Sequence, residues 1–288
     1  MVVVAERLQR VAVVCIAVCI LAACGRAVPA SYVEQASGIR FLLIPPGRFV
    51  MGSPVTEPGH RPDEQQHEVV LRHPFFLSAT EVTQQQWTSV MGYNPSHFTV
   101  AGMSAPVEQV TWYEAQEFVR RLNALNHALN QGTFRLPTEA EWEYACRAGT
   151  KTVYNYGNQA SWRLANFDGR YPLAGQPAGA YRARTVAVAG FRPNAWGLYD
   201  MHGNVWEWCD DEYCPYPATP VEDPRQRCAS AFKVIRGGSW YFDAASSRTA
   251  SRYTHQPQLH GFSIGFRVVR EAGPGGPVRA SWAGSAAR

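Results

Sequence analysis

The sequence lacks a strong excess of charge. Its 27 Lys and Arg and its 23 Asp and Glu leave a formal net charge of +4 at pH 7 over 288 residues. Proteins that bind nucleic acid usually carry a pronounced basic balance, because they neutralise phosphates with Lys and Arg. We therefore expect no nucleic-acid partner.

Long apolar runs are also missing, except near the N-terminus. Residues 11–23 are continuously apolar and follow Arg7 and Arg10. A helix that spans a bilayer needs about 20 such residues, whereas a basic start before a shorter apolar run is typical of a secretion signal. The run ends in Leu-Ala-Ala directly before Cys24. We predict a lipoprotein signal peptide over 1–23 and lipidation of Cys24; an ordinary secretory signal with a coincidental cysteine is the alternative.

A lipidated cysteine sets the expected location and organisation of the chain. One acyl chain binds a membrane only weakly, so stable attachment needs more than one. Gly25, rather than an aspartate, follows the predicted lipidated residue and gives no signal for retention at the inner membrane. We expect an exported protein anchored at the outer membrane, on its periplasmic face or at the cell surface. The expected parts are a linker over 24–37, one domain over 38–272 and a disordered tail over 273–288.

Cysteines are few after the signal, and they lack the paired spacing of a structural zinc site. Three of the seven lie in the predicted signal or directly after it, which leaves Cys146, Cys209, Cys214 and Cys228. An oxidising compartment permits disulfides. Cys214 and Cys228 flank a Pro-rich loop, so we predict a bridge between them. Cys146 and Cys209 are either a second pair or buried thiols, because spacing alone does not fix connectivity.

Regular secondary structure is predicted mainly in the first half of the chain. Three threonines are each followed three positions later by Gln or Glu, the capping-box pattern that begins a helix. These pairs are Thr83 with Gln86, Thr111 with Glu114, and Thr138 with Glu141. Runs of β-favouring residues predict strands over 38–44, 48–51, 234–236 and 265–269, and extended backbone over 68–77. Helix signals nearly vanish after residue 149, so we predict an α+β fold with much irregular backbone.

Seven segments stand out as an ordered set. They are 44–53 (IPPGRFVMGS), 81–83 (EVT), 106–112 (PVEQVTW), 135–145 (RLPTEAEWEYA), 197–208 (GLYDMHGNVWEW), 236–240 (RGGSW) and 265–267 (GFR). Together they resemble the formylglycine-generating enzyme family, also called the sulfatase-modifying-factor domain, over about residues 38–270. The resemblance implies a C-type-lectin-like fold: a small twisted antiparallel sheet with a few helices and long irregular loops.

The resemblance also implies structural calcium. The family positions of one site fall on Asp200, Gly203, Val205 and Glu207. Carboxylate and carbonyl oxygens are the ligands that calcium prefers; the alternative for Glu207 is that it only accepts hydrogen bonds from loop amides. Asn166 and the Phe167 carbonyl resemble part of a second calcium site, in which Asp168 would have to replace a missing aspartate.

The resemblance implies a copper site that this sequence does not provide. Enzymes of the family oxidise a substrate cysteine with copper held by two cysteines, because paired thiolates select Cu(I). That pair lies shortly after the Gly-Gly-Ser segment, which is 237–239 here. Residues 240–252 contain no cysteine, and none follows Cys228. We therefore expect neither bound copper nor copper-dependent oxidase activity.

Aromatic side chains are frequent in this C-terminal segment, which lines the site cleft in the family. The candidate ligand-binding residues are Trp240, Tyr241, Phe242, Arg248, Arg252, Tyr253, His255, Phe262 and Arg267. Aromatic residues with arginines would form an amphipathic pocket for a protein, peptide or glycan. Trp240 and the three arginines have a second interpretation, as framework residues that pack in the core or hold loops by ion pairs.

The leading hypothesis is thus a tethered, non-copper member of this family that binds a ligand. A formylglycine-generating or other periplasmic maturation oxidoreductase that works by a different route is the alternative from another class. The segment also resembles the variable region of retroelement-diversified proteins, at 241–243, 253–255 and 261–263. A diversified surface receptor is therefore a third hypothesis.

Overall fold

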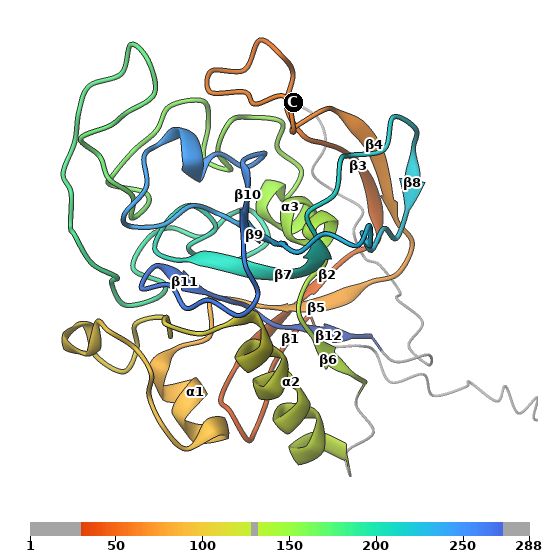
Figure 1. Ribbon diagram of the computed structural model, residues 1–288, viewed down its shortest axis with the longest axis vertical. Helices are drawn as coiled ribbons and strands as arrows, with labels where there is room; N and C mark the ends of the chain where they lie inside the picture. The colour runs from red at the N-terminus through yellow and green to blue at the C-terminus, as the bar shows by residue number, and fades with distance from the viewer. Residues whose placement is uncertain (1–29, 128–131, 273–288) are drawn as a thin grey trace, which may run out of the picture. The chain divides into compact units, whose positions relative to one another are not determined.

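The computed structural model describes residues 30–127 and 132–272 (Figure 1). The predicted signal peptide, the predicted lipidation site Cys24 and the predicted tail over 273–288 lie outside these residues. Strand β1 (Ser31–Val33) falls inside the segment expected to be a linker, so the linker prediction is too long. The reason is local packing: the ring of Tyr32 stacks on Phe41 at 5.2 Å, and β1 pairs with the first predicted strand.

The largest sheet brings the beginning and the end of the domain together. It has five strands in the order β1-β2-β5-β12-β6, and every neighbouring pair is antiparallel. After β1, its strands are β2 (Arg40–Ile44), β5 (Phe75–Ser78), β6 (Phe134–Arg135) and β12 (Val269–Glu271). Because β2 and β12 both pair with β5, segments more than 200 residues apart share one core.

Two smaller sheets complete the strand structure. One has the order β10-β9-β7-β11 and the other has the order β3-β4-β8. Their strands are β3 (Gly47–Met51), β4 (His67–Leu71), β7 (Trp206–Glu212), β8 (Val221–Glu222), β9 (Lys233–Arg236), β10 (Arg252–His255) and β11 (Ile264–Gly265). In Figure 1, β7, β9 and β10 cross above the large sheet, and α3 lies beside them.

The three predicted helices are confirmed, together with the residues that begin them. They are α1 (Gln84–Met91), α2 (Trp112–Asn126) and α3 (Glu139–Arg147). Each follows a threonine whose hydroxyl accepts the backbone N–H of the capping-box partner, while that partner's side chain accepts from the threonine N–H. Two short 3₁₀ turns add to them, η1 (Thr99–Ala101) and η3 (Ala245–Ser247).

The predicted strands over 38–44, 48–51 and 234–236 are confirmed as β2, β3 and β9. The segment 68–77, predicted to be extended, contains β4 and β5, which lie in different sheets and are separated at Pro74, a residue that cannot donate to a ladder. The single strand predicted over 265–269 is wrong, because this segment is divided between β11 and β12, which lie in different sheets.

Irregular backbone fills the space between α3 and β7. Residues 148–205 contain neither a helix nor a named strand, and they form the green and teal loops of Figure 1. This arrangement agrees with the predicted α+β fold. Among the described residues, no helix has both the length and the hydropathy needed to cross a bilayer.

The cysteine prediction is confirmed: Cys214 and Cys228 form a disulfide. Cys146 and Cys209 are free and fully buried, which settles the open choice in favour of thiols. The bridge closes the loop that carries β8, and β8 pairs with β4.

Replacing both bridging cysteines, Cys214→Ser with Cys228→Ser, should lower the free energy of unfolding by about 3 kcal/mol, because the unfolded chain regains the entropy of the open loop. Chemical denaturation measures this change. Dithiothreitol should lower the stability of the natural protein and leave the double variant unchanged. Equal sensitivity of both proteins to the reductant would contradict the assignment.

Candidate functional site

Four arginines form a buried frame around the C-terminal segment. Arg236, Arg248, Arg252 and Arg267 have no exposed side-chain surface, and each meets a buried glutamate. The partners are, in the same order, Glu143, Glu64, Glu139 and Glu207. A buried charge is tolerated only when it is paired and hydrogen-bonded, so these pairs fix where their segments lie.

The geometry of the pairs is bidentate in three cases. Arg248 donates to both oxygens of Glu64 at 2.6 and 2.9 Å, and also to Glu57 at 2.7 Å. Arg252 donates to both oxygens of Glu139 at 2.9 and 2.7 Å. These two arginines and Arg267 were candidate ligand-binding residues with a second interpretation as framework residues, and their buried ion pairs agree with that second interpretation.

The remaining candidates, apart from His255, gather on one surface. Trp240, Tyr241, Phe242, Tyr253 and Phe262, which we call the aromatic surface, are connected by ring contacts. The centroid distances include 5.3 Å for Trp240–Tyr241, 5.5 Å for Tyr241–Phe262 and 5.9 Å for Phe242–Tyr253. Tyr241 is 53% exposed, Phe262 41% and Tyr253 38%, whereas Trp240 is buried beneath them.

Four residues that the sequence reasoning missed support this surface. Trp206 on β7 stacks on Tyr253 at 5.5 Å, and Phe98 and Tyr181 contact Trp240 at 5.0 and 6.1 Å. The guanidinium of Arg61 lies 5.5 Å above the Tyr253 ring. Phe98, Tyr181 and Arg61 come from loops far away in the sequence, so no local pattern signals them; Trp206 lies in the recognised segment 197–208.

His255 differs from the other candidates. Its ring contacts Trp208 at 5.6 Å, and its Nε2 is buried without a hydrogen-bond partner. Burial lowers the pKa of His255, so the neutral ring is favoured. His255 therefore belongs to the sheet face beside the aromatic surface rather than to its exposed rings.

A second cluster consists of buried acids in the loop 197–208 and beside it. Glu81 and Asp200 are buried, and each has one carboxylate oxygen without a hydrogen-bond partner, Oε2 and Oδ1 respectively. Asn204 connects Glu81 with the segment around Val186: its Nδ2 donates to Glu81 Oε1 at 3.1 Å, and its Oδ1 accepts from the Val186 N–H at 3.0 Å. Three residues after Val186, the Ala189 N–H donates to Asp200 Oδ2 at 2.6 Å.

The acids outnumber the cations in this cluster. Glu81, Asp200 and Glu207 share one guanidinium, that of Arg267, which Glu207 occupies through both oxygens at 2.6 and 2.7 Å. Burial raises the pKa of Asp200 to about 6, and burial together with Asp200 and Glu207 raises the pKa of Glu81 well above its usual value. The site therefore has excess buried negative charge that a proton or a bound cation would neutralise.

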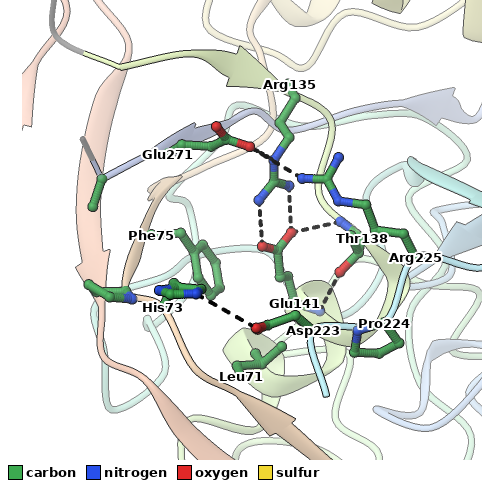
Figure 2. A pocket seen from close by; sticks show the side chains of 12 residues that line it. Leu71, His73, Phe75, Arg135, Thr138, Glu141, Asp223, Pro224, Arg225 and Glu271 are labelled. Carbon is green, nitrogen blue, oxygen red and sulfur yellow. Dashed lines mark hydrogen bonds and ion pairs between the residues drawn. The ribbon is translucent and has the colours of Figure 1, made fainter. Parts of the chain in front are cut away.

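A hollow lies elsewhere. It encloses about 290 Å³ and is lined by residues of β4, β5, β6, α3 and β12 and of the turns beside them (Figure 2). Arg135 donates to both oxygens of Glu141 at 2.7 and 2.6 Å and to Glu271 at 2.9 Å. Because these charges satisfy one another and no predicted site residue lines the hollow, we assign it no role.

Comparison with known proteins decides the family. Residues 28–272 match the Sulfatase-modifying factor enzyme 1-like domain. The chain belongs to this family. A Streptomyces coelicolor formylglycine-generating enzyme is 34% identical over 177 residues, which cover 58% of this chain and 53% of that enzyme. The chain thus spans about half the length of this relative.

Two further similar proteins cover more of the chain. "Chaperone protein LppX" of Paenibacillus barcinonensis is 32% identical over 235 residues, which cover 68% of this chain and 80% of that protein. Among solved structures, Treponema denticola variable protein 1 superposes with a TM-score of 0.72 at 27% identity and covers 85% of this chain and 100% of its own. The fold agrees with the predicted formylglycine-generating-enzyme-like architecture.

The thiols of this family member do not fit a copper site. Cys146 is fully buried, and burial raises its pKa to about 12; burial likewise raises the pKa of Cys209 well above its usual value. Among the described residues, three ligand-type side chains converge only at Glu212, Cys214 and Cys228, where both sulfurs are already in the disulfide. A thiolate pair for Cu(I) needs two ionisable, accessible sulfurs.

The implied calcium sites fit in part. Glu207 binds Arg267 and accepts the Trp142 indole N–H at 2.6 Å, so in this structure it is a frame residue rather than a free ligand. Asp200 presents its unpartnered Oδ1, and Glu81, which the sequence analysis missed, presents Oε2. The buried backbone of Gly203 and Val205 lies between Asp200 and Glu207 in the chain.

The second implied calcium site lacks its carboxylate. Asn166 is buried with Oδ1 unpartnered, next to Phe167. Asp168, which would have to replace the missing aspartate, is bound by Arg170 through both oxygens at 2.9 and 2.7 Å. Its charge is therefore already neutralised.

Removing one arginine of the buried frame should destabilise the folded protein. Arg248→Met leaves Glu64 and Glu57 buried without their cation and should cost about 3–5 kcal/mol of unfolding free energy. Denaturant titration measures this loss. Arg72→Met is the control, because Arg72 pairs with Glu222 on the exposed surface and its loss should change stability little. Equal stability of the two variants would contradict a structural role for Arg248.

Proposed function

We propose that this protein is an exported, lipid-anchored module of the sulfatase-modifying-factor family that binds a protein, peptide or glycan. The observation that carries the proposal is the aromatic surface. Three large rings, those of Tyr241, Tyr253 and Phe262, are exposed where the family resemblance implies the site cleft. The module acts without the copper chemistry of the formylglycine-generating enzymes, because no accessible thiol pair is present at that place.

The physical case for binding rests on rigidity as well as exposure. Exposed aromatic rings supply large contact area with little conformational entropy to lose, which is why Tyr and Trp dominate binding hot spots. Here the rings rest on Trp240 and Trp206, and the strand that carries Tyr253 also carries Arg252 of the frame. The surface is therefore held in shape before a ligand arrives.

The comparisons favour a macromolecular ligand. A relative of this family is named as a chaperone, a class of protein that binds other proteins. A lipid anchor at Cys24 would hold such a module at the outer membrane, where exported proteins pass. Tethering suits a module that captures partners at the membrane.

We further propose that calcium stabilises the loop 197–208 through Asp200 and Glu81. The cation would neutralise the excess charge and occupy the two unpartnered oxygens. What calcium would supply is structural: it would fix the loop that leads into β7.

Calcium should raise the melting temperature of the EDTA-treated protein by about 5 °C or more at saturation, since it binds only the folded state. Glu81→Gln and Asp200→Asn should each reduce that shift. Glu81→Gln should not destabilise the calcium-free protein, because it removes an uncompensated buried charge. Glu222→Gln, on the exposed surface, is the control and should keep the full shift. No response of the natural protein to either EDTA or calcium would refute the proposal.

Binding itself is tested in two ways. The domain is used to select ligands from a displayed library of random twelve-residue peptides, and it is also applied to a glycan array. The double variant Tyr241→Ala with Phe262→Ala should lower the affinity for the selected ligands by at least about tenfold, as expected for hot-spot residues. Tyr113→Ala is the matched control: Tyr113 is 58% exposed and, in the described chain, its ring contacts only Trp112. Ligands that bind the double variant as tightly as the natural protein would place the binding site elsewhere.

One observation favours a second candidate, a sequence-diversified receptor. The similar Treponema denticola structure is named as a variable protein. In this chain the three segments that resemble variable positions, 241–243, 253–255 and 261–263, contribute Tyr241, Tyr253 and Phe262 to the exposed surface. Sequencing the gene across a population should then show substitutions concentrated at these positions, and uniform sequences would exclude this candidate.

A further inference from the structure

Strand β10 is an open edge beside the aromatic surface. It lies at the end of the order β10-β9-β7-β11 and pairs only with β9, with Tyr253 opposite Ile235. In an antiparallel pair, alternate residues point their N–H and C=O groups away from the partner strand. Within 30–127 and 132–272, no hydrogen bond from outside the β9 ladder reaches the backbone of residues 253–255.

The face of β10 next to this edge is aromatic. Side chains two residues apart in a strand share a face, and Tyr253 and His255 both lie over β7, against Trp206 and Trp208 at 5.5 and 5.6 Å. Tyr253 also contacts Phe242 at 5.9 Å, which continues the face into the aromatic surface. Backbone groups of β10 that lack a described partner thus lie beside an aromatic face, on which Tyr253 is the exposed ring.

The edge lacks three of the devices that protect natural edge strands, which are Lys, Pro and a bulge. It keeps two others, because the strand has only 4 residues and Arg252 points a charge inward. Residues 252–255 contain neither Lys nor Pro, and their register with β9 is continuous. One end is closed, because Arg252 is buried and donates to the Asp63 carbonyl at 3.2 Å. The accessible part is therefore 253–255.

We propose that the ligand is an extended polypeptide segment that adds to the edge of β10 as a fifth strand. Its alternate side chains, apolar or aromatic, would lie on Tyr253 and Phe242, and its backbone would bond to the free groups of β10. This inference rests on the proposed binding function and names the class and conformation of the ligand. A polypeptide backbone supplies donors and acceptors at the spacing of a strand, whereas a glycan does not.

The test uses a library of seven-residue peptides in which Thr alternates with Val, Tyr or Phe. Fluorescence anisotropy identifies the tightest binders to the natural domain. Each binder is then made in two N-methylated forms, one for each set of alternate amides. We expect one form to bind at least about tenfold more weakly and the other to change little, because only one set faces β10.

Amide hydrogen exchange supplies a second, independent measurement. The bound peptide should slow exchange in β10 and leave exchange in β3, a strand of another sheet, unchanged. Equal effects of the two methylated forms would overturn strand addition, and so would unchanged exchange in β10. If Tyr241→Ala still weakens peptide binding in either case, the proposed binding function survives. Binding of glycans but not of the peptide library would also overturn the inference while leaving the binding function intact. Failure of peptides and glycans alike to bind would remove both.

Discussion

The pairing of buried arginines with buried glutamates is the constraint on which the rest of this structure depends. Four guanidinium groups from the C-terminal third are fully buried, and three of their partners, Glu64, Glu139 and Glu143, come from the first half of the chain. A charge left unpaired in the interior costs several kcal/mol, so each pair has one acceptable geometry. The pairs thereby fix loops that have few ladder hydrogen bonds of their own.

This frame explains how an aromatic surface can be exposed without collapsing. Arg252 and Tyr253 are neighbours on β10: the first is held by Glu139 inside the protein, and the second presents its ring outside. The same segment follows the Gly-Gly-Ser turn, where the family resemblance implies a copper-binding thiol pair. In this chain that stretch contains no cysteine, and Phe242 packs there against Trp206 at 5.4 Å.

Local signals in the sequence predicted the local structure well. The capping boxes at Thr83, Thr111 and Thr138 involve neighbours within three residues, and all three helices begin there. The strand β7 was not predicted, because its acidic sequence is stabilised by neighbours that are distant in the chain. The burial of Arg248, and the unpartnered oxygen of Glu81, depend on contacts across more than 100 residues and have no local signature.

The central claim is that a ligand-binding surface has taken the place of thiolate copper chemistry. Its most direct test is a Cu(I) titration of the reduced, folded domain against a chromophoric chelator, followed by incubation with a cysteine-containing peptide and oxygen. The account predicts that the chelator retains the copper and that no aldehyde forms on the peptide. Retention of one Cu(I) per chain, together with conversion of the peptide cysteine to an aldehyde, would contradict it.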